Sequence, residues 1–113
     1  MNSLSVQISE HDRQILSSVK NIVHSFQPSA SLYLYGSAAR SERSQESDYD
    51  ILVLTDNNLS TKEEDEIIDA VYDLELNCGV VISLIFYTKA EWQNPAFSYH
   101  PFHQNVEKEA IFT

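Results

Sequence analysis

Two aspartates that stand two positions apart, Asp48 and Asp50, are the residues of this sequence best suited to bind a cation. They directly precede the apolar run 51–54, which predicts that they lie at the start of a β-strand. Because strand side chains alternate, both carboxylates should project from one face, roughly 7 Å apart. Neighbouring carboxylates repel each other without a cation, and all-oxygen ligation favours Mg²⁺ or Mn²⁺ over zinc. The pair therefore predicts a divalent-metal site.

A second chemical feature, Gly36-Ser37, follows the aromatic-rich segment 32–35, which we expect to be a strand. Glycine lets the backbone approach a phosphate closely, and the amides of a helix start and the Ser37 hydroxyl can donate hydrogen bonds to it. We expect one or two helical turns over 37–43 and a loop over 44–47. Ten residues separate Ser37 from Asp48, enough for phosphate donors and metal ligands to meet over one triphosphate.

In this order, the two features resemble a known family signature. The segments Gly36-Ser37-Ala38-Ala39-Arg40 and Ser47-Asp48-Tyr49-Asp50-Ile51-Leu52-Val53 closely resemble the DNA polymerase β-like nucleotidyltransferase superfamily. More narrowly, they resemble the minimal nucleotidyltransferases of bacteria and archaea. The resemblance implies that Gly36 and Ser37 hold the triphosphate of ATP, and that Asp48 and Asp50 are the catalytic, metal-binding residues. Arg40 and Ser47 also match the nucleotide-binding motif, where they should hold the loop.

The sequence departs from this family at two points. Ser41 replaces the glycine that usually follows the motif arginine. The family also places a third carboxylate on the third strand, whereas 80–87 contains no acid. Ser83 is its one small polar residue, and a serine cannot replace a carboxylate as base or anionic ligand. Ser83 either lines the nucleotide pocket or is a satisfied hydroxyl in a core strand; another acid, such as Asp56 or one from a partner, could fill the third position.

The elements that must position these residues follow from periodicity and capping. Ser9 predicts the N-cap of a helix that ends before Pro28, and Ser60 with Glu63 matches a capping box that opens another. We expect strands over 49–55 and 80–87, the latter central because it is apolar on both faces, and short helices over 89–93 and 102–110. Apolar residues recur at helical spacing on the two long helices: Ile15, Val19, Ile22 and Phe26 on the first, and Ile67, Val71, Leu74 and Cys78 on the second.

This order of elements predicts an α/β fold, a small nucleotidyltransferase-fold domain with a mixed sheet of three to four strands flanked by helices. The 113 residues fit a single domain over 1–113. No apolar run reaches the roughly 20 residues that span a bilayer, and the first residues lack a signal-peptide pattern, so we expect a cytoplasmic protein. The aromatic-rich stretch of Trp92, Phe97, Tyr99 and Phe102 is expected to cap the core, with partner binding as the alternative.

The formal net charge of −10, from 17 acidic and 7 basic residues, argues against direct nucleic-acid or membrane binding and is compatible with a basic protein partner. The single cysteine, Cys78, excludes an internal disulfide and is expected in the core. His100 and His103 flank Pro101 without a clear third ligand, which argues against zinc. Homo-oligomers are left open.

The main hypothesis is a Mg²⁺-dependent (or Mn²⁺-dependent) nucleotidyltransferase that transfers AMP from ATP to a hydroxyl of a partner protein. The resemblance implies that this partner is a small helical HEPN-domain toxin modified on tyrosine, with this chain as its antitoxin. The missing carboxylate motivates an alternative, a non-catalytic module that neutralises its partner by contact. A third reading is a small-molecule nucleotidyltransferase of the aminoglycoside-modifying type, whose helical acceptor domain this chain lacks.

Overall fold

The computed structural model describes residues 8–36 and 48–113. Within them, one mixed sheet has the strand order β3-β2-β1-β4. Strand β2 pairs parallel with β3 and antiparallel with β1, and β4 pairs antiparallel with β1. The expected α/β class and small mixed sheet are therefore confirmed. The strands are β1 (Ser31–Tyr35), β2 (Asp48–Thr55), β3 (Val81–Thr88) and β4 (Ile111–Phe112).

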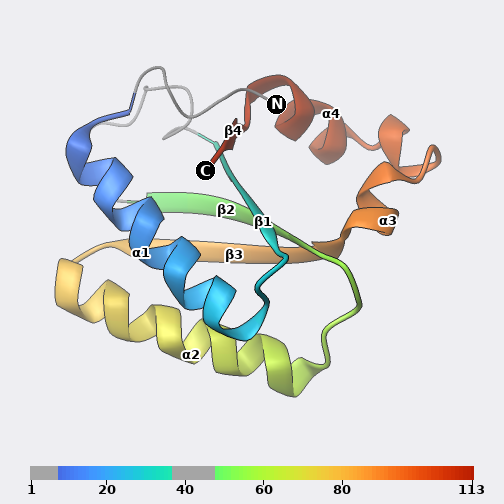
Figure 1. Ribbon diagram of the computed structural model, residues 1–113. Helices are drawn as coiled ribbons and strands as arrows, with labels where there is room; N and C mark the ends of the chain where they lie inside the picture. The colour runs from blue at the N-terminus through green and yellow to red at the C-terminus, as the bar shows by residue number, and fades with distance from the viewer. Residues whose placement is uncertain (1–7, 37–47) are drawn as a thin grey trace.

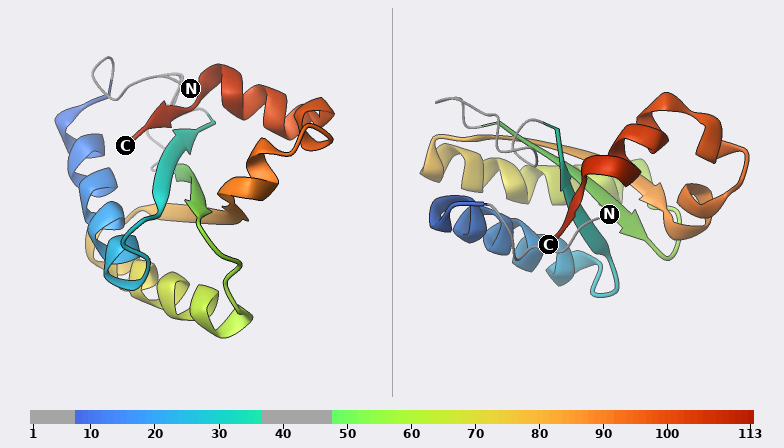
Figure 2. Two further views of the ribbon diagram at one scale, coloured as in Figure 1. Left: turned by 45° about the vertical axis from the view of Figure 1, so that its right-hand side comes forward. Right: turned by 90° about the horizontal axis from the view of Figure 1, so that it is seen from above.

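Helices cover both faces of this sheet (Figures 1 and 2). Two long helices lie side by side on one face, and a short helical segment from the C-terminal third covers part of the other. The first layer consists of α1 (Glu10–Phe26) and α2 (Thr61–Cys78), and the second of α3 (Lys89–Gln93), the 3₁₀ turn η1 (Phe97–Tyr99) and α4 (Pro101–Glu109). No helix in these residues is long and apolar enough to cross a bilayer.

The helix ends follow the capping signals in the sequence. The Ser9 side chain accepts a hydrogen bond from the Asp12 amide at the start of α1. Ser60 and Glu63 form the expected capping box of α2. Gly79 ends α2 in the left-handed conformation, with φ of 67°, a region that glycine enters without steric cost. The predicted helix starts at Ser9 and at Ser60 with Glu63 are confirmed, whereas the role of Gly79 was not predicted.

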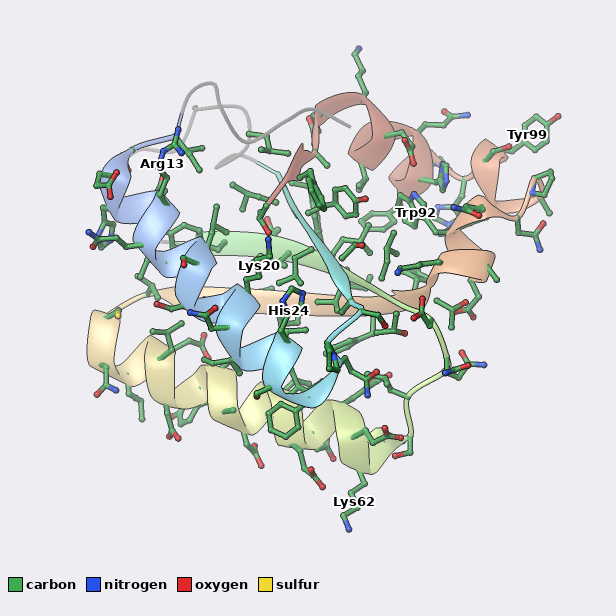
Figure 3. The ribbon with its side chains drawn as sticks, in the orientation of Figure 1. Arg13, Lys20, His24, Lys62, Trp92 and Tyr99 are labelled. Carbon is green, nitrogen blue, oxygen red and sulfur yellow. The ribbon has the colours of Figure 1, made fainter. Side chains whose placement is uncertain are left out.

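Alternation along β2 divides its side chains between two cores. Tyr49, Ile51 and Val53 pack beneath α1 and α2, whereas Leu52 and Leu54 pack beneath α3 and α4. The second core is rich in aromatic rings, and we call these rings the aromatic cluster: Tyr35, Tyr87, Trp92, Phe97 and Phe102. Figure 3 labels Trp92, whose indole N–H donates to Glu107 at 2.6 Å. The predicted core role of this stretch is confirmed except at Tyr99, which is 81% exposed.

Two other expectations about elements are wrong, and one short strand was not predicted. Among the described residues, strand β3 is an edge strand, not a central one, and helices cover its apolar residues on both faces of the sheet. Cys78 is exposed, although it was expected in the core, because it is the last residue of α2. Strand β4 was not foreseen, since two residues after a helix carry no periodicity of their own. The outer edge of β3 is met by α2, because the Ile82 amide donates to the Glu75 carboxylate at 2.8 Å.

Candidate metal and nucleotide site

The two motif aspartates are the first and third residues of β2 and therefore share one face of the sheet. This is the face of Leu52 and Leu54, which α3 and α4 cover further along the strand. Asp48 is exposed and Asp50 is half-buried. Burial raises the pKa of Asp50, and the charge of Asp48 raises it further. A cation held between the two carboxylates would relieve this repulsion, so the donor chemistry of the pair fits a hard divalent metal.

Gly36 lies directly against Asp50, and two features of its backbone require glycine. Its φ is 77°, in the left-handed region. A Cβ at this position would lie 2.5 Å from Oδ2 of Asp50, closer than non-bonded atoms approach. The end of β1 and the start of β2 are therefore in contact at the site. This brings together the two motif halves as far as the structure describes them.

Strand register places Asp50 between Tyr35 of β1 and Ser83 of β3. Tyr35 lies at the boundary between the aromatic cluster and the carboxylates, because its ring makes an edge contact with Phe102 at 5.5 Å. Burial, followed by the charge of Asp50, raises the pKa of Tyr35. The site thus has an aromatic wall on one side, which suits a base or ribose ring, and a carboxylate pair on the other.

The third carboxylate of the family pattern has no equivalent on β3. Ser83 occupies the position beside Asp50 and is exposed on the site face, so it lines the site rather than being a satisfied core hydroxyl. Asp56 cannot fill the vacant position, because it lies six residues beyond Asp50, about 20 Å along the strand direction. Asp56 is instead held by Ser29 at 2.5 Å and by Lys89 at 3.0 Å.

The other predicted residues fall into two groups. Ser37, Arg40, Ser47 and the expected helical turns at 37–43 lie outside the described residues. His100 and His103 serve local structure: His100 accepts from the amide of Phe102, and His103 stacks on Trp92. Among the described residues, no group of three or more His, Cys, Asp or Glu side chains could hold a metal ion.

Two residues that support the site were not predicted from the sequence. Tyr49, between the two aspartates, is fully buried, and its hydroxyl donates to Asp12 of α1 at 2.6 Å. A signal was present, because Asp12 falls on the same helical stripe as Ile15 and Val19. Tyr35 was read only as a strand residue, although it immediately precedes Gly36 and shares the face of Asp50.

A glycine-backed pair of strand aspartates on a small mixed sheet flanked by helices characterises domains that transfer nucleotidyl groups. The chain belongs to the nucleotidyltransferase domain family, whose model matches residues 16–112. No curated protein matches the sequence significantly.

Solved structures share the fold. A toxin–antitoxin crystal structure with AMP-PNP aligns with a TM-score of 0.60 and 18% identity, covering 85% of this chain and 69% of that one. A mutant of the toxin–antitoxin MntA-HpeT aligns with a TM-score of 0.56 and 18% identity, covering 95% of this chain and 72% of that one. At this identity, the likeness supports the fold alone.

Proposed function

We propose that this protein transfers AMP from ATP to a hydroxyl group of a partner protein, and that it acts as the antitoxin of a HEPN-type toxin–antitoxin pair. The observation that carries the proposal is the placement of Asp48 and Asp50 on one sheet face with Gly36 against Asp50. Membership of the nucleotidyltransferase domain family supports the reaction class. The toxin–antitoxin setting is part of the proposal and is motivated by what the structures of the same fold are, namely toxin–antitoxin structures, one of them with AMP-PNP.

In the proposed reaction, an acceptor oxygen attacks the α-phosphorus of ATP, pyrophosphate leaves and the hydroxyl proton is released. Asp48 and Asp50 would hold Mg²⁺, which supplies charge neutralisation at the triphosphate. Gly36 leaves the space in which the Asp50 carboxylate sits, and Tyr35 lies beside Asp50 on the neighbouring strand. Ser37, Arg40 and Ser47 are proposed to contact the triphosphate from the loop, and Ser83 from the neighbouring strand.

The test has two stages. ATP is first titrated calorimetrically into the purified chain, with and without Mg²⁺, and into Asp48→Asn/Asp50→Asn. We expect binding that requires both the metal and the aspartates. The product of the neighbouring gene, as the candidate toxin, is then incubated with ATP, Mg²⁺ and either form of the protein. Intact-mass spectrometry should show one added AMP with the native chain and none with the double variant.

A second candidate function is a non-catalytic module that neutralises its partner by contact. It is favoured by one observation, the absence of any acidic residue over Val81–Thr88. The same experiment separates the two. A stable complex with Asp48→Asn/Asp50→Asn that silences the toxin, with the toxin mass unchanged even by the native chain, would support the contact mechanism and refute transfer.

A further inference from the structure

An apolar stripe runs along the outer face of α2, away from the sheet. Ile68, Tyr72 and Leu76 are 44%, 55% and 65% exposed. Their spacing of four places them one above another on the helix, over about 12 Å of its length. In Figure 1, α2 lies at the lower edge of the molecule, and its buried residues Ile67 and Val71 each precede a stripe residue by one position, about 100° around the helix toward the sheet. The described part of the fold leaves the stripe exposed.

Negative charge lies along one side of this stripe. Asp69 and Asp73 each follow a stripe residue by one position, which places them about 100° around the helix along one side. Lys62 is the one basic residue of α2, and it lies at the first turn, pointing away from the sheet (Figure 3). The acidic residues of α2 are Glu63, Glu64, Asp65, Glu66, Asp69, Asp73 and Glu75.

This combination selects one kind of occupant. A second copy of the chain would bring one acidic helix against another in a protein of net charge −10, and like charges across an interface are unfavourable. Nucleic acid and anionic membrane are disfavoured for the same reason. An amphipathic helix that presents an apolar stripe flanked by lysine or arginine would cover the leucine, isoleucine and tyrosine side chains. Its basic residues would form ion pairs with the aspartates beside them.

The position of the stripe relates it to the site. Leu76 is near the C-terminal end of α2, which leads through Gly79 into β3. The first residue of β3, Val81, pairs with Asp48 and is itself 55% exposed. The stripe therefore runs toward the end of the sheet that carries the carboxylates, although α2 and the carboxylates lie on opposite faces of that sheet. A chain bound along the stripe would reach the site around the outer edge of β3.

We propose that the outer face of α2, formed by Ile68, Tyr72 and Leu76 and flanked by Asp69 and Asp73, is the docking surface for a basic amphipathic helix of the acceptor protein. That the docked protein is also the acceptor rests on the proposed transferase function. The docking surface itself is separate from the carboxylate site and is testable without any transfer reaction.

The probe is a fluorescently labelled synthetic helical peptide with leucines along one face and lysines on both flanks, titrated with the native chain and followed by anisotropy. We expect saturable binding that weakens with added salt. Ile68→Ser and Leu76→Ser, which keep every charge, should each weaken binding about tenfold, as expected for loss of a buried side chain. Tyr99→Ser is the matched control, because Tyr99 is exposed on the other helical layer (Figure 3), and it should bind as the native chain does.

Asp69→Asn/Asp73→Asn should reduce both the affinity and its salt dependence. Absence of peptide binding would refute the docking surface. Equal binding to Ile68→Ser, Leu76→Ser and the native chain would also refute it, because the binding would then come from general electrostatic attraction. The melting temperature of each variant and its Mg²⁺-dependent ATP binding are measured alongside. Peptide binding that depends on the stripe, without ATP binding, would refute the transferase function and support the docking surface. ATP binding together with peptide binding that does not depend on the stripe would refute the docking surface and support the transferase function.

Discussion

The hydroxyl of Tyr49 donates a 2.6 Å hydrogen bond to the carboxylate of Asp12, in a part of the core where both residues are buried. Asp12 belongs to the first turns of α1, and Tyr49 stands between the two site aspartates. The bond therefore joins the helical layer to the strand segment that carries the carboxylates. Its donor is on the opposite face of β2 from the site, so it fixes the backbone without entering the reaction space.

Replacing Tyr49 with phenylalanine should destabilise the fold. The change removes a hydrogen bond to a buried carboxylate, whose loss costs about 1.5–3 kcal/mol of the free energy of unfolding. Urea denaturation at neutral pH measures the change. Tyr72→Phe is the matched control, since Tyr72 is exposed on α2, and should change stability by less than about 0.5 kcal/mol. Equal stability of Tyr49→Phe and native protein would contradict the structural role given to this bond.

Alanine at Gly36 should damage both stability and the metal site. The left-handed φ costs about 1–2 kcal/mol for a residue with a Cβ, and that Cβ would displace the Asp50 carboxylate. Gly79→Ala is a matched control, because Gly79 has a similar φ but nothing lies within 4 Å of its added Cβ. We expect both variants to lose stability, and only Gly36→Ala to lose Mn²⁺ affinity as measured by electron paramagnetic resonance. Equal Mn²⁺ binding by the two variants would show that the Asp50 carboxylate tolerates displacement.

Asparagine at Asp50 should stabilise the metal-free protein near neutral pH. The raised pKa of Asp50, caused by burial and then by Asp48, means that its charged form is disfavoured in the folded state. Solvent screening limits the gain in the free energy of unfolding to at most about 1 kcal/mol. Saturating Mg²⁺ should reverse the order, because only the native pair gains binding energy from the ion. Thermal melts of both proteins, in chelator and in Mg²⁺, measure the two differences in melting temperature. If Asp50→Asn is the more stable protein in both media, the result would argue against a metal at this pair.

Asp56 should stabilise the folded protein at neutral pH and lose this effect in acid. The hydrogen bond from Ser29, followed by Lys89, lowers the pKa of Asp56 below its ordinary value. A lowered acid pKa stabilises the folded state above the unfolded pKa, near 3.9, and this contribution is lost as the pH falls through the folded value. Asp56→Asn should therefore have a lower urea midpoint than native protein at pH 7, and the gap should close toward pH 3. Ser29→Ala, which keeps the charge, should show a smaller gap at pH 7. A gap that persists undiminished at low pH would indicate a cause other than ionisation.

The sequence predicted well whatever depends on local chemistry. Ser9, Ser60 and Glu63 mark helix starts through side-chain hydrogen bonds to nearby amides, and the alternation of β2 put both aspartates on one face. Such features involve residues within a few positions of each other. They are visible in any short window of the chain.

Features that depend on distant partners were not predictable in the same way. The edge position of β3 depends on strand order, and an apolar strand buried by helices resembles one buried by neighbouring strands. The contact of Gly36 with Asp50 and the bond from Tyr49 to Asp12 join residues that are 14 and 37 positions apart. The roles of Ser37, Arg40 and Ser47 in nucleotide binding stay predictions.

The hydrogen bond from the Ile82 amide to Glu75 has a consequence for how the protein behaves at high concentration. A free strand edge is a template on which further strands add, and natural proteins guard such edges with charge. Glu75 places an anion on an outward amide of β3 close to its first residue, where an incoming strand would bring its own carbonyl oxygen. Strand addition from that end would have to expel the carboxylate and then face its repulsion. One side chain of α2 thereby opposes the growth of cross-β aggregates from an otherwise apolar eight-residue edge.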